Sequence, residues 1–383
     1  MNDRTARAAL TAVAEPGEAL LNRIIDRAGP AGALEAIRAA RPPEDVITTE
    51  HDVPRAVARL QQWRIRLQAV DPGQDLAVAG NLGLRLACPG DPEWPTTLDD
   101  LGDERPYALW LRGPEDLRYN CLRSVAIVGA RAASPYGLRV AADLGAELAE
   151  QGWTVISGGA LGIDAAAHRG ALAADGPTVA VFANGVDVPY PAGNDGLFAE
   201  MARCALLVSE SPPGTPPRRS RFLVRNRVIA ALSRGTVVVE AAWRSGALST
   251  ATWARKLGRD VMAVPGPVGA HTSAGCHRLL REHPPALLVT RSEEVIEAVG
   301  RIGADLAPEP HNPVLPRDRL DPVTRTVLET MPARGPAGPA QLAAKAGLDL
   351  ATVNGKLGLL AAAGFVERTT GGWRLTPAAK ARQ

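Results

Sequence analysis

The stretch that decides the fold is residues 124–164, which read SVAIVGARAASPYGLRVAADLGAELAEQGWTVISGGALGID. The apolar run at 125–128 has the length and branching of a buried parallel strand, and it ends at Gly129. A helical pattern follows, and then a second strand at 154–157 that ends in the glycine-rich run at 158–162. We predict two strand-to-helix turns that expose backbone N–H groups along one edge of a sheet, where open α/β sheets bind anions.

Length and composition fit a globular chain of two or three domains, with 383 residues of which 46% are hydrophobic. The net charge is only +2, so a nucleic-acid partner would have to meet a local basic patch. The four cysteines show no C-x-x-C spacing, and we expect neither a metal nor a cofactor. No apolar run reaches the length of a membrane helix and no signal-like core follows the N-terminus, so we predict a cytoplasmic location without a membrane partner.

Between residues 124 and 303, strand-like runs alternate with helical patterns. Beyond the two strands above, apolar runs predict strands at 178–182, 205–209, 236–240, 261–264 and 287–289. This alternation predicts an α/β fold with an extended Rossmann-like, mainly parallel sheet and helices on both faces. The loops that follow the carboxyl ends of these strands are expected to open into one crevice.

Two segments precede this sheet. Residues 1–70 carry helical patterns broken by glycine and proline, which predict a small helical domain similar to SAM or helix-hairpin-helix units. Its turn at 15–17 either contacts a DNA backbone or belongs to a packing module, and we adopt the packing interpretation. Residues 71–123 are turn-rich, with one strand expected at 107–112, and are predicted to pack on the sheet as an extension.

Two further segments follow the sheet. Residues 304–316 are too rich in proline for a helix or a central strand and are predicted to form a linker. Residues 317–383 contain three helical patterns and then a hairpin signal, the order of a winged-helix domain. Its third helix has only Asn354 and Lys356 as polar side chains that could contact DNA bases. Weak duplex binding and protein contact therefore both stay open.

Motifs of common nucleotide-binding enzymes are missing. No G-x-G-x-x-G follows the first strand and no G-x-x-x-x-G-K-[ST] occurs, which argues against a nicotinamide site and an ATP-binding P-loop. Asp164 and His168 are four positions apart on a predicted helix and would share one face. Because no third ligand has a suitable spacing, we interpret the two as structural partners at the helix start. No nucleophile with a base emerges elsewhere, so we do not expect an enzyme.

Arginine is concentrated where the crevice is expected. Residues 211–239 contain no acidic residue but six arginines: Arg218, Arg219, Arg221, Arg225, Arg227 and Arg234. A guanidinium binds phosphate oxygens bidentately, so this stretch is the local basic patch that a nucleic acid would need. In the alternative interpretation, Arg225 and Arg227 pair with carboxylates such as Glu240 and hold loops in place.

Aromatic and hydroxyl side chains lie near the same loops in the sequence. Phe222, Tyr136 and Trp243 would offer stacking faces beside the basic groove, which is how single strands are held, although Phe222 and Trp243 could equally be structural. Ser157 and Ser245 are interpreted as hydroxyl groups that donate to phosphate.

Six motifs occur in the order found in the DNA-processing protein DprA (Smf) family, which the central half of the chain resembles. They are VGAR at 128–131 with PYG at 135–137, SGGALGID at 157–164 with AH at 167–168, VPYP at 188–191, RNRVIA at 225–230, SGAL at 245–248 and VPG at 264–266. The resemblance implies a dimeric recombination mediator rather than an enzyme. It would bind single-stranded DNA, protect incoming strands and load RecA, as in natural transformation or related recombination.

The resemblance also implies roles for individual residues. Arg131 matches the arginine of the family's Gly-Ser-Arg turn, and Arg225 and Arg227 match its basic pocket. The family commonly has serine where Ala130 stands, which removes one hydroxyl while the neighbouring backbone N–H groups remain. The residues expected to bind DNA are Gly129, Arg131, Ser134, Ser157, Gly158, Gly159, Arg221, Phe222, Arg225, Asn226, Arg227, Ser245 and Gly246.

A second function class uses a similar open sheet. Phosphoribohydrolases that act on nucleoside monophosphates carry a Pro-Gly-Gly-x-Gly-Thr run followed by glutamate. Here Pro265 and Gly266 continue as Pro-Val-Gly without such a carboxylate. We therefore favour the DNA-binding mediator and keep a nucleotide-processing enzyme as the alternative.

Overall fold

A nine-stranded sheet has the order β1-β2-β6-β5-β4-β3-β7-β8-β9. The seven consecutive strands β6, β5, β4, β3, β7, β8 and β9 are parallel to one another. At the other edge, β2 pairs antiparallel with β6, and β1 pairs antiparallel with β2. The bounds are β1 Leu84–Ala87, β2 Leu109–Arg112, β3 Ser124–Val128, β4 Thr154–Ser157, β5 Thr178–Phe182, β6 Leu206–Ser209, β7 Gly235–Val238, β8 Asp260–Ala263 and β9 Leu287–Leu288. The predicted α/β class with a mainly parallel sheet is confirmed.

This computed structural model describes residues 1–47, 52–301, 305–308 and 316–380. The chain divides into two compact units, Met1–Pro308 and Glu309–Gln383. The boundaries predicted near residues 70 and 123 do not separate compact units, because all of this part belongs to the first one. Most of the predicted linker lies outside the described residues.

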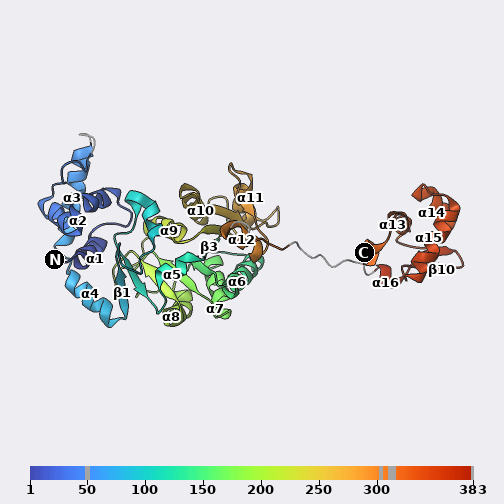
Figure 1. Ribbon diagram of the computed structural model, residues 1–383, viewed down its shortest axis with the longest axis horizontal. Helices are drawn as coiled ribbons and strands as arrows, with labels where there is room; N and C mark the ends of the chain where they lie inside the picture. The colour runs from blue at the N-terminus through green and yellow to red at the C-terminus, as the bar shows by residue number, and fades with distance from the viewer. Residues whose placement is uncertain (48–51, 302–304, 309–315, 381–383) are drawn as a thin grey trace. The chain divides into compact units, whose positions relative to one another are not determined.

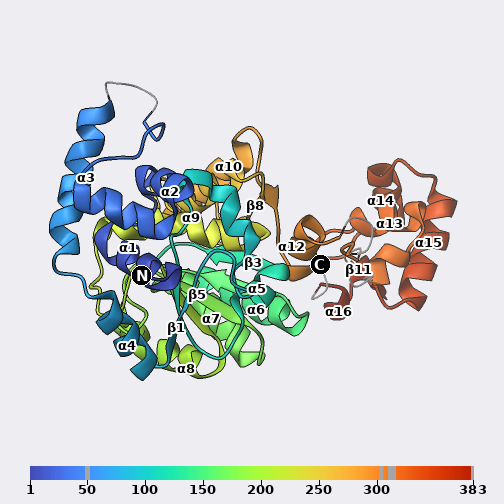
Figure 2. The same ribbon diagram turned by 60° about the vertical axis from the view of Figure 1, so that its left-hand side comes forward.

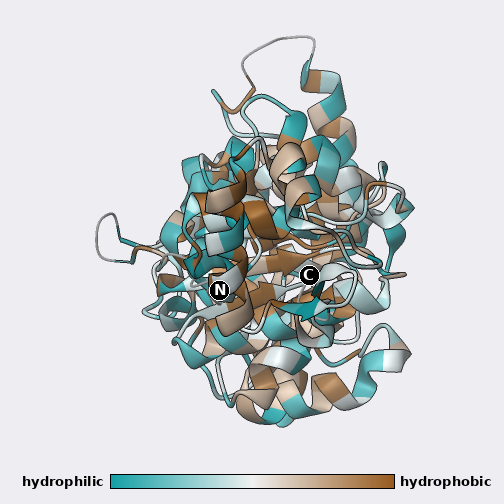
Figure 3. Ribbon diagram, turned by 90° about the vertical axis from the view of Figure 1, so that its right-hand side faces the viewer, coloured by the Kyte–Doolittle hydropathy of each residue, from teal (hydrophilic) through white to brown (hydrophobic). Residues whose placement is uncertain are grey.

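Helices cover both faces of the sheet because the central strands are apolar on both sides. In β3, Val125 and Ile127 pack in one core with helices α6 and α7, while Ala126 and Val128 pack in the opposite core with α9 and α10. Figures 1 and 2 show α9 and α10 on one side and α6, α7 and α8 on the other, and in Figure 3 hydrophobic colour is concentrated on the strands between them. The bounds are α5 Leu117–Leu122, α6 Pro135–Glu150, α7 Ile163–Ala173, α8 Asp195–Cys204, α9 Arg219–Leu232, α10 Ala247–Lys256, α11 Ala274–Arg281 and α12 Ser292–Val299.

The direction in which strands are added reverses at β3. From β3 the chain steps outward through β4, β5 and β6, and it then returns through α9 to place β7 on the other side of β3. The carboxyl ends of β3 and β7 therefore flank a topological switch point. In an open α/β sheet this is where a crevice for ligands forms.

The N-terminal helices lie at the antiparallel edge of the sheet, where α1 and α4 share a core with β1 and β2, while α2 and α3 pack against α1 (Figure 1). They are α1 Asp3–Val13, α2 Ala19–Ala39, α3 Val53–Leu67 and α4 Pro72–Asn81. One of the expected glycine and proline breaks falls inside α2, where Gly29 has a φ of 73° and Pro30 follows it. Buried Ala8 and Ala79 share a core with Trp110 of β2, which explains why this region is not a separate unit. Helix α4 falls where the sequence suggested only turns.

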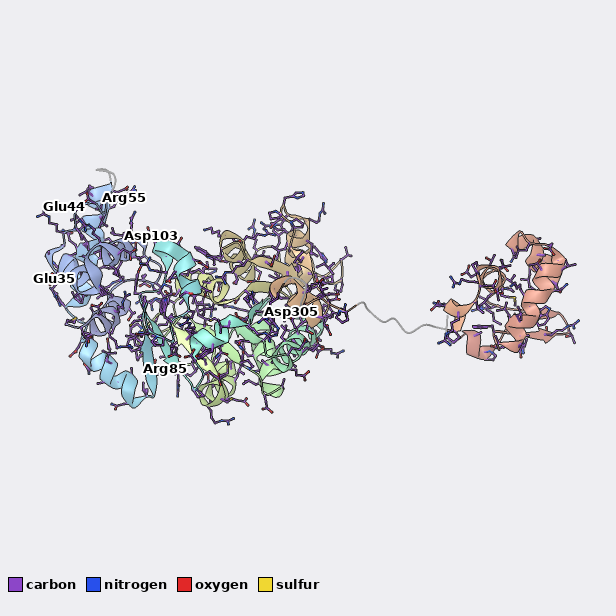
Figure 4. The ribbon with its side chains drawn as sticks, viewed as in Figure 1. Glu35, Glu44, Arg55, Arg85, Asp103 and Asp305 are labelled. Atoms are coloured by element: carbon purple, nitrogen blue, oxygen red, sulfur yellow. The ribbon has the colours of Figure 1, made fainter. Side chains whose placement is uncertain are left out.

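Within residues 71–123, for which one strand was expected, the structure contains two strands at the edge of the sheet. Strand β1 was not anticipated, and β2 begins at Leu109, within the expected range. Arg85 of β1, labelled in Figure 4, pairs with Glu93 at 2.6 Å and so holds the loop after its own strand. A nine-residue 3-10 helix, η2 Thr96–Glu104, then packs near α9 on one face.

In the described part of the second unit, three helices are followed by a two-stranded antiparallel hairpin, in the predicted order, with a short 3-10 helix, η5 Pro316–Arg319, before them and a short helix, α16 Pro377–Lys380, after them. The bounds are α13 Pro322–Glu329, α14 Pro339–Ala346, α15 Leu350–Ala362, β10 Val366–Thr369 and β11 Gly372–Leu375. Ala337 forms an isolated bridge with Trp373 of the hairpin, and Val327, Leu342, Val353 and Leu357 are fully buried between these elements.

Candidate functional site

A pocket of about 1110 Å³ opens at the carboxyl ends of β3 and β7, at the switch point of the sheet. The turn after β3, the start of α7, the first half of α9 and the segment after β7 line it. Seven of the residues predicted to bind DNA are among its lining residues: Gly129, Arg131, Phe222, Arg225, Asn226, Ser245 and Gly246. The expected crevice is thus present, but the remaining six predicted residues are not in its lining.

At the first strand-to-helix turn a buried carboxylate binds part of the backbone that we predicted to be free, including the N–H group of Ser134. Glu240, which follows β7, accepts hydrogen bonds from the backbone N–H of Ser134 at 2.8 Å and from the Ser134 hydroxyl at 2.6 Å. Thr272 donates a third at 3.1 Å, and the N–H of Ala130 donates to the Glu240 carbonyl at 2.7 Å. Ser134 is the N-cap of α6, so Glu240 takes the place that an external anion would have at this helix end.

The second turn is occupied in the same way by Asp164. Its carboxylate accepts from the N–H groups of Gly158 at 3.2 Å and Ala160 at 3.4 Å. Burial raises the pKa of Asp164, although the charge of Arg225 and these amide donors act in the opposite direction. Gly162 allows the two turns to approach, because its φ is +83° and a Cβ there would collide with the carbonyl of Ala130. The N–H groups of Gly158 and Ala160 are therefore bound within the protein.

Two predicted DNA ligands at the second turn are committed to the fold as well. The Ser157 side chain is fully buried and its hydroxyl donates to the carbonyl of Ile127 at 2.6 Å, so it cannot donate to phosphate as expected. The carbonyl of Gly159 accepts a bond from the Asn194 side chain at 3.0 Å.

Asp164 and His168 are both buried and structural, as interpreted, but they do not pair. His168 Nδ1 lies 2.7 Å from the Thr178 hydroxyl, and that hydroxyl donates to the carbonyl of Val155 at 2.8 Å. Thr178 must then accept from His168, which assigns the proton of the neutral ring to Nδ1. Burial, with a smaller contribution from the charge of Arg225, lowers the pKa of His168 to about 3.

Arg225 forms part of the pocket wall and also supports the second turn. Its guanidinium donates to the carbonyls of Gly158, at 2.9 Å, and Val181. A Cβ at Gly158 would collide with this guanidinium, so a larger residue there would displace the Arg225 side chain. Burial lowers the pKa of Arg225 to about 10, and the side chain therefore keeps its charge at neutral pH.

Arg227 does not reach the pocket, contrary to our expectation. Its side chain is fully buried and donates to both carboxylate oxygens of Glu210 at 2.6 Å, and its Nε donates to the carbonyl of Glu104 at 2.7 Å. The alternative that we weighed, pairing with a carboxylate, is what the structure contains, with Glu210 as the partner in place of Glu240.

Arg221 also turns away from the pocket, towards the N-terminal region. It binds Glu15 bidentately, at 2.7 and 3.1 Å, and Arg218 lies 3.7 Å from the same carboxylate. Gly17 packs against the guanidinium of Arg227, so the turn at residues 15–17 contacts α9. This geometry agrees with the packing interpretation of the N-terminal turn.

Three arginine side chains at the pocket are exposed: Arg131, Arg219 and Arg244. Asp164 is the one acidic side chain among the described residues that line the pocket, and its charge is taken up by backbone donors and Arg225. The pocket is therefore strongly cationic at its rim. Arg244 was not identified from the sequence, although it directly follows Trp243 beyond the end of β7.

An aromatic pair lies in the same pocket. The guanidinium carbon of Arg131 is 5.3 Å from the centre of the Phe222 ring. The centre of the Tyr190 ring is 5.6 Å from the centre of the same Phe222 ring. Phe222 is thus part of the site rather than of the core. Tyr190 was overlooked as a site residue, although its VPYP motif was noted.

The other two aromatic candidates are not in the pocket lining. Trp243 is 55% exposed and has the guanidinium of Arg278 at 5.3 Å from its ring centre. The Tyr136 hydroxyl donates to the carbonyl of Pro265 at 2.8 Å. Among the residues that the structure describes, no three His, Cys, Asp or Glu side chains converge as a metal site would require, and none of the helices could span a bilayer.

Comparisons with known proteins connect this geometry to a family. Residues 85–300 match the family described as DNA recombination-mediator protein A. The chain is 43% identical over 387 residues to the putative DNA processing protein DprA of Mycobacterium tuberculosis, an alignment that covers 98% of this chain and 95% of that protein. It is 40% identical over 220 residues to protein Smf of Escherichia coli, covering 56% of this chain and 57% of that one.

Solved structures give the same result. The X-ray structure of DprA from Streptococcus pneumoniae matches with a TM-score of 0.61 and 31% identity, over 76% of this chain and 96% of that one. DNA processing protein A from Helicobacter pylori, whose structure concerns the single-stranded DNA binding mode of that protein, matches with a TM-score of 0.50 and 29% identity, over 56% of this chain and 94% of that one.

Proposed function

The chain belongs to the DNA recombination-mediator protein A family, whose members are also called DprA or Smf, and we propose that it binds single-stranded DNA in the pocket between β3 and β7. The observation that carries the proposal is the pocket rim, where three exposed arginines surround an aromatic pair. Arginine guanidinium groups neutralise phosphates, and aromatic rings stack on bases. Proteins that bind single strands combine these two kinds of contact.

The contacts to phosphate are assigned to side chains. Glu240 and Asp164 bind the N–H groups of Ser134, Gly158 and Ala160, and we assign the phosphate contacts to Arg131, Arg219 and Arg244, with Ser245 and Gly246 beside them at the start of α10. Arg221 and Arg227 are left out of this set, since Glu15 and Glu210 bind their guanidinium groups.

The same two carboxylates argue against the nucleotide-processing alternative. A mononucleotide phosphate in such a sheet binds at the amino end of a helix, through backbone N–H groups. Here Glu240 and Asp164 bind backbone N–H groups beside both helix ends, and the hydroxyls of Ser134 and Ser157 donate to internal acceptors. We therefore propose a binding protein and not an enzyme.

We extend the proposal to the role that the family name describes, a recombination mediator. In this role a homodimer would protect incoming single strands and load RecA onto them, in natural transformation or in related recombination. Support for these finer points comes from family membership.

The second unit is proposed to be a winged-helix domain that contacts protein. On α15, Lys356 binds Asp321 at 3.1 Å, and the exposed Leu359 lies on the same helix, 58% exposed. A helix that offers so little free positive charge is poorly suited to a duplex backbone.

Fluorescence anisotropy with a single-stranded oligonucleotide over a salt series tests the proposal. Arg131→Ala is compared with native protein and with Arg234→Ala, an exposed arginine at the opposite end of β7, where its N–H donates to the carbonyl of Ser124. We expect weaker binding by Arg131→Ala, with a log–log salt slope smaller by about 0.7, and native behaviour for Arg234→Ala. Absence of binding by the native chain, or equal effects of both substitutions, would overturn the proposal.

A further inference from the structure

We propose that Tyr190 is the residue on which a base of the bound strand stacks, with Phe222 as the support behind it; this rests on single-stranded DNA binding in the pocket. The two rings form one contact, 5.6 Å between centres at an interplanar angle of 44°. Both residues line the pocket although they are far apart in the sequence, one in the VPYP segment after β5 and the other on α9.

The two rings differ in what already covers them. Phe222 is only partly exposed and carries the guanidinium of Arg131 at 5.3 Å as well as the Tyr190 ring. Tyr190 is 41% exposed, and Phe222 is the ring that contacts it among the described residues. The outer aromatic surface of the pocket is therefore that of Tyr190, while Phe222 is held between its neighbours.

The order Arg131, Phe222, Tyr190 separates two kinds of contact within one site. Arg131, in the turn after β3, places its positive charge beside the Phe222 ring, and Tyr190 makes the ring–ring contact with Phe222. A strand whose phosphate lies at Arg131 would place a neighbouring base against Tyr190. Binding through Arg131 depends on salt through counterion release, whereas stacking on a tyrosine depends on the presence of a base.

Each base has a π-face, so a tyrosine platform accepts all four and gives little sequence preference. A strand without bases would keep the phosphate contacts and lose this one. Stacking on Tyr190 would therefore make the protein bind a normal single strand more tightly than an abasic strand with the same sugar–phosphate backbone. That distinction is open to measurement.

The experiment measures the anisotropy of two labelled oligonucleotides of equal length, oligo-dT and an abasic strand of tetrahydrofuran nucleotides, with the full-length chain. Tyr190→Ala removes the ring, Tyr190→Leu keeps apolar contact with Phe222, and Tyr190→Phe keeps the ring without its hydroxyl. Tyr119→Ala is the matched control, because Tyr119 is 74% exposed on α5, before the amino end of β3. Urea unfolding confirms that each variant is folded.

We expect Tyr190→Ala and Tyr190→Leu to bind oligo-dT about tenfold more weakly and the abasic strand as native protein does, with an unchanged salt slope. Tyr190→Phe and Tyr119→Ala should resemble the native chain on both strands. The inference is overturned if Tyr190→Leu binds oligo-dT like native protein, or if both strands lose affinity equally. If the native chain binds neither strand, the proposed function itself fails, and this result is distinguishable from failure of the Tyr190 assignment alone.

Discussion

The Glu240 carboxylate accepts two hydrogen bonds from Ser134, one from the backbone N–H at 2.8 Å and one from the hydroxyl at 2.6 Å. Glu240 is 2% exposed, so a protein group neutralises the amino end of α6 where a Rossmann-like enzyme would bind a phosphate. This carboxylate also orients the turn that carries Arg131. The positive charge at the crevice consequently comes from side chains.

Ser134→Ala should destabilise the first unit by about 1–2 kcal/mol, because it removes the N-cap of α6 and one hydrogen bond to a buried carboxylate. Urea unfolding with an unchanged m-value measures this. Ser134→Thr, which retains the hydroxyl, should lose less. A variant with native stability but without DNA binding would show instead that the hydroxyl contacts the strand.

Arg227→Met should cost about 3–5 kcal/mol of unfolding free energy, because it leaves the nearly buried Glu210 carboxylate without its partner. The double variant Arg227→Met with Glu210→Leu should recover most of this loss, since both buried charges are then absent. Chemical denaturation of the two single variants and the double variant measures the coupling. If the double variant is stable but binds DNA much more weakly than native protein, the assignment of Arg227 to the fold is wrong.

The sequence predicted the sheet well because its strands are buried on both faces and are continuous apolar runs. Strand β1 was missed, since LRLA at 84–87 is short and stands at an edge in a turn-rich region. The crevice was also predictable, because parallel strands bring their carboxyl ends together. Seven of the thirteen residues assigned to DNA do line it.

The partners of individual charges could not be predicted in the same way. Arg221 and Glu15 are 206 positions apart, and no local pattern indicates that they meet. Helical spacing places Arg225 and Arg227 on different faces of α9, but it does not reveal that Arg225 is the one at the pocket and that Arg227 meets Glu210. Tyr190 was part of a noted motif, but its contact with Phe222 depends on how two distant loops fold.

Stability should fall as the pH is lowered below about 6.5, because the unfolded chain then binds a proton at His168 that the folded chain does not bind until the pH nears 3. This group alone contributes a slope of up to about 1.4 kcal/mol per pH unit across that interval. His168→Asn places a side-chain nitrogen near Thr178 without a titrating ring. Urea unfolding from pH 7 to pH 5 should show a smaller slope for this variant; equal slopes would contradict the assignment.

Glu15→Gln should weaken the attachment of the N-terminal helices to α9. The hydrogen bond from Arg221 lowers the pKa of Glu15, so its contribution is present above the ordinary carboxylate pKa and is lost as the pH falls through the lowered value. Glu15 is 38% exposed and therefore screened, and we expect a loss of about 1 kcal/mol that diminishes in high salt. Hydrogen exchange of the first turn of α9 should become faster. The exposed Glu35 on α2, labelled in Figure 4, supplies the control Glu35→Gln, which should not change it.

Arg244→Ala tests the part of the site that only the three-dimensional arrangement identifies. Arg244 is exposed and lines the pocket, whereas nearby Arg278 is bound to Glu282 at 2.6 Å and is not in the lining. If Arg244 neutralises one phosphate, its removal should weaken single-strand binding and reduce the log–log salt slope by about 0.7, while Arg278→Ala leaves the slope unchanged. Anisotropy over a salt series provides both values. The same slope for native protein and Arg244→Ala would restrict the phosphate contacts to Arg131 and Arg219, and the strand would then leave the pocket before it reaches α10.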